Sequence, residues 1–260
     1  MRLGSVHRRD GERVVKQLTE RHPAGRNFVA AMASSGEQGM RSYLAELDRV
    51  AVRLPGNLEI VSAEPLTVQH RWMDGPTLLD APTMTPEVFA SAIAEVATWV
   101  RRLDRRDARV DTNLANFCIV NGRPVLVDVL PPLVPSRRPR PTSLFDDLFL
   151  SLCFDTSVIL DALCGYALRQ AIRSGDRGVI ADLLGVVNDL VSSPETTGLA
   201  KEWFRARLKL ARRAARGVVD PEMMHEFFAL TSVLKFRHFD EPGRRRRVDE
   251  VAIRIRELDL

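Results

Sequence analysis

An Asn121-Gly122 pair between two short apolar segments constrains the fold of this chain more than any other feature. This dipeptide, flanked by apolar residues, is the strongest short-range signal for a tight β-hairpin. A hairpin brings together the residues that stand just before and just after it. We therefore expect Asn116 and Asp128 to lie next to each other at the open end of the two strands.

Asp111 adds a third polar side chain, five residues before Asn116, which in turn stands twelve residues before Asp128. An amide oxygen and a carboxylate in one place suit Mg²⁺, a hard cation that prefers oxygen ligands. A nearby carboxylate can accept or orient the proton of an attacking hydroxyl. Phosphoryl transfer uses this set of groups. The alternative is that Asp and Asn occur here as ordinary turn-flanking residues.

In this order and spacing, the sequence resembles the kinase fold, and more closely the aminoglycoside phosphotransferase branch of small-molecule kinases. The catalytic loop of that family reads His-x-Asp-x-x-x-x-Asn and is followed by a strand pair and a metal-binding Asp. The resemblance implies that Asp111 is the catalytic base or orienting group, and that Asn116 and Asp128 are Mg²⁺ ligands. Arg109 stands where the family has a scaffolding His, and Val-Leu-Pro-Pro follows Asp128 where the family has Phe-Gly or an aromatic residue.

Residues 5–18 indicate a second hairpin around an Asp-Gly turn, with Lys16 after two valines on its second strand. In the kinase pattern V-A-I-K this lysine holds nucleotide phosphates, so the resemblance implies the same role for Lys16. It also implies a carboxylate on the following helix that pairs with the lysine. Glu46 is the candidate and Glu37 the competitor. A solvated surface side chain is the alternative for each of the three.

The segment that begins Trp72-Met73-Asp74 and continues with Gly-Pro follows two expected strands. It resembles the hinge segment of the kinase family, whose backbone recognises the edge of adenine. The resemblance therefore implies that Trp72, Met73 and Asp74 contribute to nucleotide binding. An ordinary Asp-Gly-Pro turn is the alternative.

Residues 1–4 precede the first hairpin, whereas the kinase pattern places a further strand and a glycine-rich loop there. Such a loop forms a nest of backbone N–H groups over the phosphates. We therefore expect nucleotide binding that is weak by itself and that improves when a substrate or a partner chain closes over the cleft.

Helical periodicity and helix start signals dominate the rest of the sequence. Thr85 followed by Pro86 is typical of a helix start. A proline-rich run at 131–141 predicts an extended loop, and Arg244 to Arg247 indicate a basic loop. Strands are expected at 58–61 and 66–72, and helices at 28–47 with a break near 34–36, at 85–103, 143–173, 176–192, 198–216 and 220–236, and from 248 onward.

These elements predict an α+β fold of two lobes, a small N-terminal β-sheet lobe over residues 1–78 and a mostly helical C-terminal lobe over residues 79–260. The resemblance places ATP and Mg²⁺ in the cleft between them. A composition of 45% hydrophobic and 28% charged residues is ordinary for a globular chain. The three cysteines and five histidines form no metal-binding motif, so we expect reduced thiols in a cytoplasmic protein. We expect no signal peptide and no membrane span.

The resemblance implies transfer of the γ-phosphoryl group of ATP to a hydroxyl of a small molecule, as in antibiotic modification or a natural-product pathway. One alternative is the kinase component of a peptide Ser/Thr dehydratase, similar to those of class V lanthipeptides, and another is a catalytically inactive pseudokinase that acts as a binding protein. The expected partners are a nucleotide and a hydroxyl-bearing small molecule or peptide, with a protein partner as an open alternative. The basic run at 244–247 lacks the interleaved aromatic residues of a nucleic-acid site.

Overall fold

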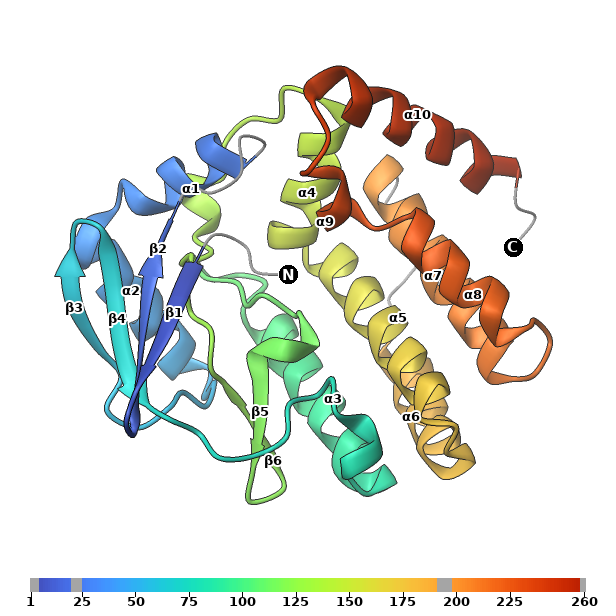
Figure 1. The fold of residues 1–260 in the computed structure, drawn as a ribbon, viewed down its shortest axis with the longest axis horizontal. Helices are drawn as coiled ribbons and strands as arrows, with labels where there is room; N and C mark the ends of the chain where they lie inside the picture. The colour runs from blue at the N-terminus through green and yellow to red at the C-terminus, as the bar shows by residue number, and fades with distance from the viewer. Residues whose placement is uncertain (1–4, 20–24, 191–197, 258–260) are drawn as a thin grey trace.

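The fold is α+β, with a small antiparallel sheet on one side of the molecule and a larger group of helices on the other (Figure 1). This is the fold class expected from the sequence. The structure is a computed structural model that describes residues 5–19, 25–190 and 198–257. The front segment 1–4 and the expected helix end at 191–192 lie outside the described residues.

The sheet has the strand order β1-β2-β4-β3, and all neighbouring strands are antiparallel. Its strands are β1 (Ser5–Asp10), β2 (Arg13–Leu18), β3 (Glu59–Ala63) and β4 (Leu66–Arg71). Gly11 lies in the β1–β2 turn with φ +58°, a value that glycine adopts without strain. Alternation along β2 points Val14, Lys16 and Leu18 to one face of the sheet, and all three are buried. The expected hairpin over residues 5–18 is confirmed.

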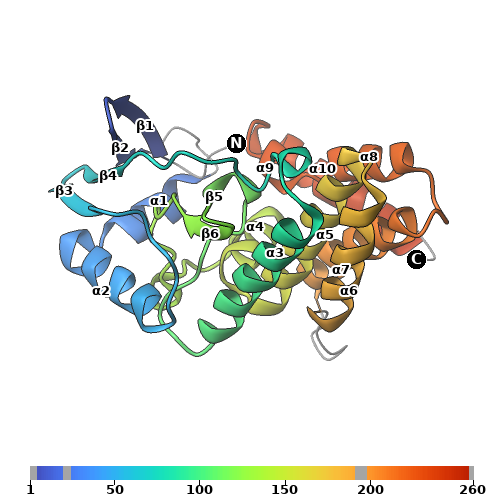
Figure 2. The ribbon, with the colours of Figure 1, turned by 90° about the horizontal axis from the view of Figure 1, so that it is seen from below.

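Two helices, α1 (Arg26–Ala33) and α2 (Gly36–Arg49), connect β2 to β3. The chain breaks between them, as expected, and Gly36 takes a positive φ of +55° at the start of α2. α2 lies below the sheet in the view of Figure 2 and buries one stripe of side chains, Met40, Tyr43 and Leu47.

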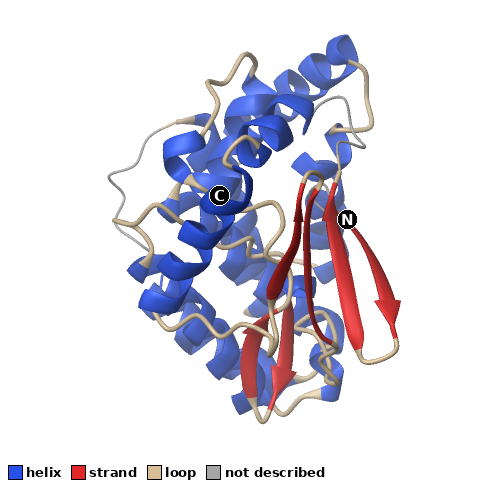
Figure 3. Ribbon diagram, turned by 90° about the vertical axis from the view of Figure 1, so that its left-hand side faces the viewer, coloured by secondary structure: helices blue, strands red, loops and turns tan. Residues whose placement is uncertain are grey.

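A second hairpin, β5 (Phe117–Val120) and β6 (Arg123–Leu126), stands between the sheet and the helices. Asn121 and Gly122 in its turn have φ of 52° and 73°, which is the pair of positive values that a two-residue type I′ turn requires. Figure 3 shows the strands of both sheets on one side, with the helices behind them. The predicted hairpin is therefore confirmed.

The helical part begins at α3 (Pro86–Arg102), where the Thr85 side chain accepts a hydrogen bond from the Val88 amide. α5 packs against α7, and α3 packs against α6. The remaining helices are α4 (Leu144–Phe154), α5 (Thr156–Ser174), α6 (Arg177–Leu190), α7 (Leu199–Ala215), α8 (Pro221–Leu230), α9 (Val233–Phe236) and α10 (Glu241–Glu257).

Three expectations about the helical part need correction. The single helix expected at 143–173 is two helices, because the chain bends by 84° between α4 and α5, and the helix expected at 220–236 divides into α8 and α9. The basic loop expected at 244–247 is wrong, because these arginines lie in α10, whose first turn accommodates Pro242. The proline-rich run 131–141 contains a short 3₁₀ turn at Pro135–Arg137.

Among the described helices, none alone is both long and apolar enough to cross a membrane. α4 and α5 pass that test only as a pair, by length and composition, and most of their residues are buried in the protein.

One hydrophobic core runs from the sheet into the helical part. Phe28 of α1 packs edge-to-face on Phe149 of α4, with ring centroids 5.1 Å apart, and on Phe154 at 6.1 Å. The three cysteines are buried and carry free thiols. The predicted boundary between the two lobes, at residues 78 and 79, stays a prediction. The hydrophobic core contains residues from both sides of it.

Candidate functional site

The β5–β6 hairpin brings Asn116 and Asp128 together, as its sequence predicts. The Val127 amide donates a hydrogen bond of 2.8 Å to the Asn116 carbonyl, so the chain entering the hairpin lies beside the chain leaving it. Asn116, Asp128 and Lys16 all line one cavity of about 340 Å³ between the sheet and the hairpin. Three of the side chains expected to act together therefore meet at one place.

The cavity lining combines polar and apolar side chains. The polar ones are His7, Lys16, Asn113, Asn116 and Asp128. The less polar ones are Val14, Met73, Ala115, Cys118 and Val127. His70, Trp72, Gly75 and Thr77 complete the lining.

Asp111 stands next to this cavity, at the start of the loop that leads to β5. Its carboxylate accepts a hydrogen bond from the Asn113 amide at 3.0 Å, and its carbonyl accepts one from the Asn116 side chain at 3.3 Å. Surrounding protein atoms displace water from the carboxyl and raise its pKa to about 6, and the negative charge of Asp128 acts in the same direction. Asp111 is thus a carboxylate whose pKa lies close to neutrality.

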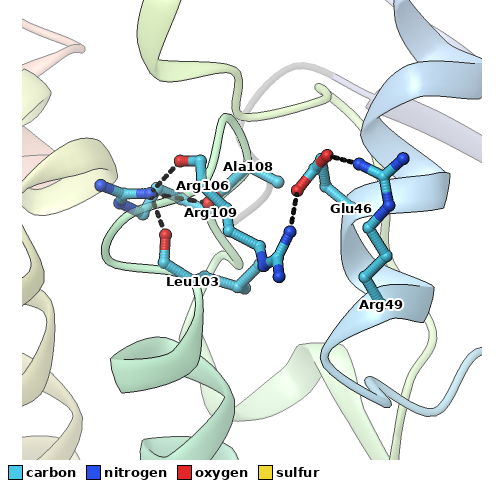
Figure 4. A network of polar contacts seen from close by, with 6 residues as sticks. All are labelled: Glu46, Arg49, Leu103, Arg106, Ala108 and Arg109. Carbon is cyan, nitrogen blue, oxygen red and sulfur yellow. Dashed lines mark hydrogen bonds and ion pairs between the residues drawn. The ribbon is translucent and has the colours of Figure 1, made fainter.

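Arg109 fixes the chain segment that precedes Asp111 by hydrogen bonds to backbone carbonyls, three of which are shown in Figure 4. Its buried guanidinium donates hydrogen bonds of 2.6 to 3.0 Å to a ring of backbone carbonyls, those of Leu103, Asp104, Arg106, Ala108 and Phe154. Its own carbonyl accepts a hydrogen bond of 2.9 Å from the Tyr43 hydroxyl of α2. Arg109 therefore positions the chain just before Asp111.

Lys16 extends from β2 into the cavity. Its ammonium lies 3.3 Å from the Asp128 carboxylate and also donates to the Val127 carbonyl. The side chain is buried, and water screens this pair less than it would screen a surface pair. Lys16 thus links the sheet to the end of the β5–β6 hairpin.

The expected pairing of Lys16 with Glu46 is wrong. The Glu46 carboxylate pairs with Arg49 and, at 3.2 Å, with Arg106 (Figure 4). Residues three apart on a helix lie on the same face. Tyr43, three residues before Glu46, donates a hydrogen bond from its hydroxyl to the Arg109 carbonyl. That face of α2 is directed at the turn after α3 and not at β2. The competitor Glu37 pairs with Arg41 along the exposed side of α2.

The linker that follows β4, residues 72–80, contributes part of the cavity wall. Trp72 and Met73 line it, whereas Asp74 is outside the lining and accepts a hydrogen bond of 2.6 Å from the Trp72 indole. The thiol of Cys118 lies 3.4 Å from the Gly75 carbonyl. A side-chain carbon at Gly75 would stand 2.3 Å from the Ile119 carbonyl, so only glycine fits this close approach.

Sequence reasoning missed two histidines and Asn113 on the cavity wall. His70 is buried, and its Nδ1 lies 2.7 Å from the Arg71 carbonyl; because a carbonyl only accepts, Nδ1 carries the proton. Burial lowers the pKa of His70. Strand register was the available signal, since His7 pairs with Lys16 and His70 pairs with Val14 on the neighbouring strands.

The oxygen-bearing side chains in this cavity suit a metal ion that takes most of its ligands from phosphates and water and only a few from the protein. Within the described residues, no three His, Cys, Asp or Glu side chains are grouped so that they could hold a metal ion. Asn116 and Asp128 supply only two oxygen-bearing side chains, which is how Mg²⁺ is bound when phosphates and water complete its shell.

The sequence matches no model of a known protein family and no curated protein. The resemblance to kinases therefore stays a prediction from the sequence motifs.

Proposed function

We propose that this chain is a kinase-type phosphotransferase, which moves the γ-phosphoryl group of ATP to a hydroxyl of a small molecule. The observation that carries the proposal is the meeting of Lys16, Asn116 and Asp128 on one cavity wall. Lys16 is distant in sequence from Asn116 and Asp128, and all three have the chemical types that phosphoryl transfer uses.

The form of the cavity supports a nucleotide as the ligand. Its volume of about 340 Å³ lies at the lower end of the range of about 300–1,000 Å³ that is usual for small-molecule sites. Met73, Gly75 and Cys118, which line the cavity at the linker, suit a flat purine ring. Lys16, Asn116 and Asp128 suit the phosphates and their metal ion.

Each polar residue then has a role. Asn116 and Asp128 would hold Mg²⁺, which when bound bridges phosphate oxygens and offsets their charge. Lys16 would exchange its contact with Asp128 for a phosphate oxygen. Asp111, with a pKa of about 6, is mostly ionised at neutral pH and is suited to accept the proton of a hydroxyl. The choice of a small-molecule acceptor rests on the resemblance to that branch of kinases.

Nucleotide binding is the first test of the proposal. ATP with Mg²⁺ at a hundred times its Kd is expected to stabilise the protein by about 2.7 kcal/mol, which a thermal-shift assay detects as a higher Tm. Adenosine and ATP without metal serve as comparisons. Absence of any stabilisation at millimolar nucleotide would contradict the proposal.

A kinase-shaped binding protein is the second candidate, and one observation favours it. Lys16 is paired with Asp128 and with the Val127 carbonyl, and neither Glu37 nor Glu46 of α2 is placed to hold it for phosphates. This candidate predicts nucleotide binding without phosphoryl transfer and without ATP hydrolysis above background. Steady-state assays of the wild-type protein with a panel of hydroxyl acceptors separate the two candidates.

A further inference from the structure

Strand β1 directs alternate side chains to the cavity side of the sheet. Its register with β2 places His7 opposite Lys16 and Arg9 opposite Val14. Residues directly opposite each other on antiparallel strands point to the same face. Because Lys16 and Val14 both line the cavity, His7 and Arg9 are on the cavity side, whereas Arg8, opposite Val15, points to the other side.

His7 is one of the polar residues that line the cavity. Directly opposed residues on paired strands have Cβ atoms about 4.5–5.5 Å apart, so the side chains of His7 and Lys16 leave the sheet side by side, and both line the cavity. Asn113, Asn116 and Asp128 line the cavity as well, on the catalytic loop and the end of the hairpin. The space around His7 and Lys16 is thus the part of the cavity where phosphates of a nucleotide would lie.

Arg9, near the C-terminal end of β1, contacts Trp72 of the linker. Its guanidinium lies 4.2 Å from the centre of the Trp72 ring, and its Nε donates a hydrogen bond of 3.0 Å to the Gly11 carbonyl. The indole in turn donates to Asp74. β1 is therefore held along β2 by the sheet and at its turn end by Trp72, which keeps His7 in position.

We propose that β1 supplies a side-chain hydrogen-bond donor for the nucleotide polyphosphate. An imidazole N–H of His7 donates to a phosphate oxygen beside Lys16. This inference rests on the proposed function and deepens it. Its chemistry differs from a nest of backbone N–H groups, because the donor is a side chain that a single substitution removes. This hydrogen bond contributes to binding of the phosphates and not to binding of the base.

Calorimetric titration of three proteins with ATP and Mg²⁺, and with adenosine, tests the inference. The proteins are the wild type, His7→Ala and the matched control Arg8→Ala, which removes a side chain from the opposite face of the same strand. His7→Ala is expected to weaken ATP binding about tenfold, as for the loss of one hydrogen bond to a charged group, and to leave adenosine binding unchanged. Arg8→Ala is expected to leave both unchanged.

His7→Gln separates loss of the donor from loss of strand structure. It keeps an N–H donor and is expected to recover most of the ATP affinity, whereas a His7→Gln protein as weak as His7→Ala would overturn the donor role. Equal losses for ATP and adenosine, or an equal loss in Arg8→Ala, would also overturn the inference. If His7→Ala binds ATP as tightly as the wild type, the inference fails while the proposed function stands. If the wild type binds no ATP, both fail.

Discussion

At the scale of single residues, Asp111 combines two features that disfavour its ionised form. Protein atoms displace water from the carboxyl, and the Asp128 carboxylate is close enough to repel it. The pKa of about 6 in the folded protein exceeds the value of about 3.9 of an unfolded Asp. The folded state therefore binds more protons than the unfolded state between these values, and this group lowers stability as the pH rises from about 4 to about 6.

Replacement of Asp111 by Asn is expected to stabilise the fold at pH 7. The amide oxygen still accepts from the Asn113 amide, while the desolvated charge is gone. The gain is on the order of 1–2 kcal/mol, less than the full shift implies because water still reaches part of the side chain. Urea denaturation at pH 7 measures it, and the gain is expected to vanish near pH 4. An equal gain for the exposed Asp104→Asn would contradict this account.

The same substitution is expected to lower phosphoryl transfer by about 10²–10⁴-fold while nucleotide binding persists, because a positioned acid–base group is lost. In the wild type, kcat/KM is expected to rise with pH through about 6, since only the ionised carboxylate accepts a proton. A pH profile that is flat between 5 and 7, two values on either side of the expected pKa of about 6, would assign the proton transfer to another group.

At the scale of elements, the junction between the linker and β5 fixes the part of the cavity wall that the linker supplies. The Leu78 amide donates to the Phe117 carbonyl, and the Ile119 amide donates to the Pro76 carbonyl. These two bonds bring the linker alongside β5, and the absence of a side chain at Gly75 permits the approach. The linker is thus positioned by the hairpin, and the cavity wall depends on both.

Gly75→Ala is expected to destabilise the protein by about 1–3 kcal/mol, since the new methyl group forces the linker away from β5. Gly56→Ala is the matched control, because a side-chain carbon there meets nothing within 4 Å. Chemical denaturation of the two variants gives the comparison. Equal stability of both would show that the linker accommodates the methyl group without leaving β5.

At the scale of the whole molecule, the sheet and the helices share one core. Phe28 from the N-terminal part packs against Phe149 and Phe154 of α4. Lys16 of the sheet forms an ion pair with Asp128, which follows the β5–β6 hairpin. Contacts of this kind couple the two parts during unfolding. We therefore expect the two predicted lobes to unfold as one cooperative unit.

A single unfolding transition is the expected consequence. Native-state hydrogen exchange measures the opening free energy of amides in β2 and β4 and of those in α5, and the most protected amides of both parts are expected to report the same global value. Tryptophan fluorescence and far-ultraviolet circular dichroism are expected to give coincident transitions. Loss of protection in the sheet at a much lower free energy would show two independent units.

Local patterns in the sequence determined the elements and one neighbourhood. The Asn121-Gly122 turn, the alternation in β2 and the Thr85-Pro86 start specify structure through nearby backbone geometry, and the hairpin alone placed Asn116 beside Asp128. Local signals did not reveal the bend between α4 and α5, or that Arg244 to Arg247 continue a helix. In both places the local signals are compatible with more than one structure.

Only the tertiary structure decided which side chains face one another. The rotation of α2 directs Glu46 to Arg106 instead of Lys16, and the pairing of β2 with the distant strand β4 brings His70 opposite Val14. The pKa of Asp111 likewise depends on what surrounds it in space. Periodicity specifies which face of an element is buried, but the partner on that face is set by register, helix rotation and packing between segments far apart in the chain.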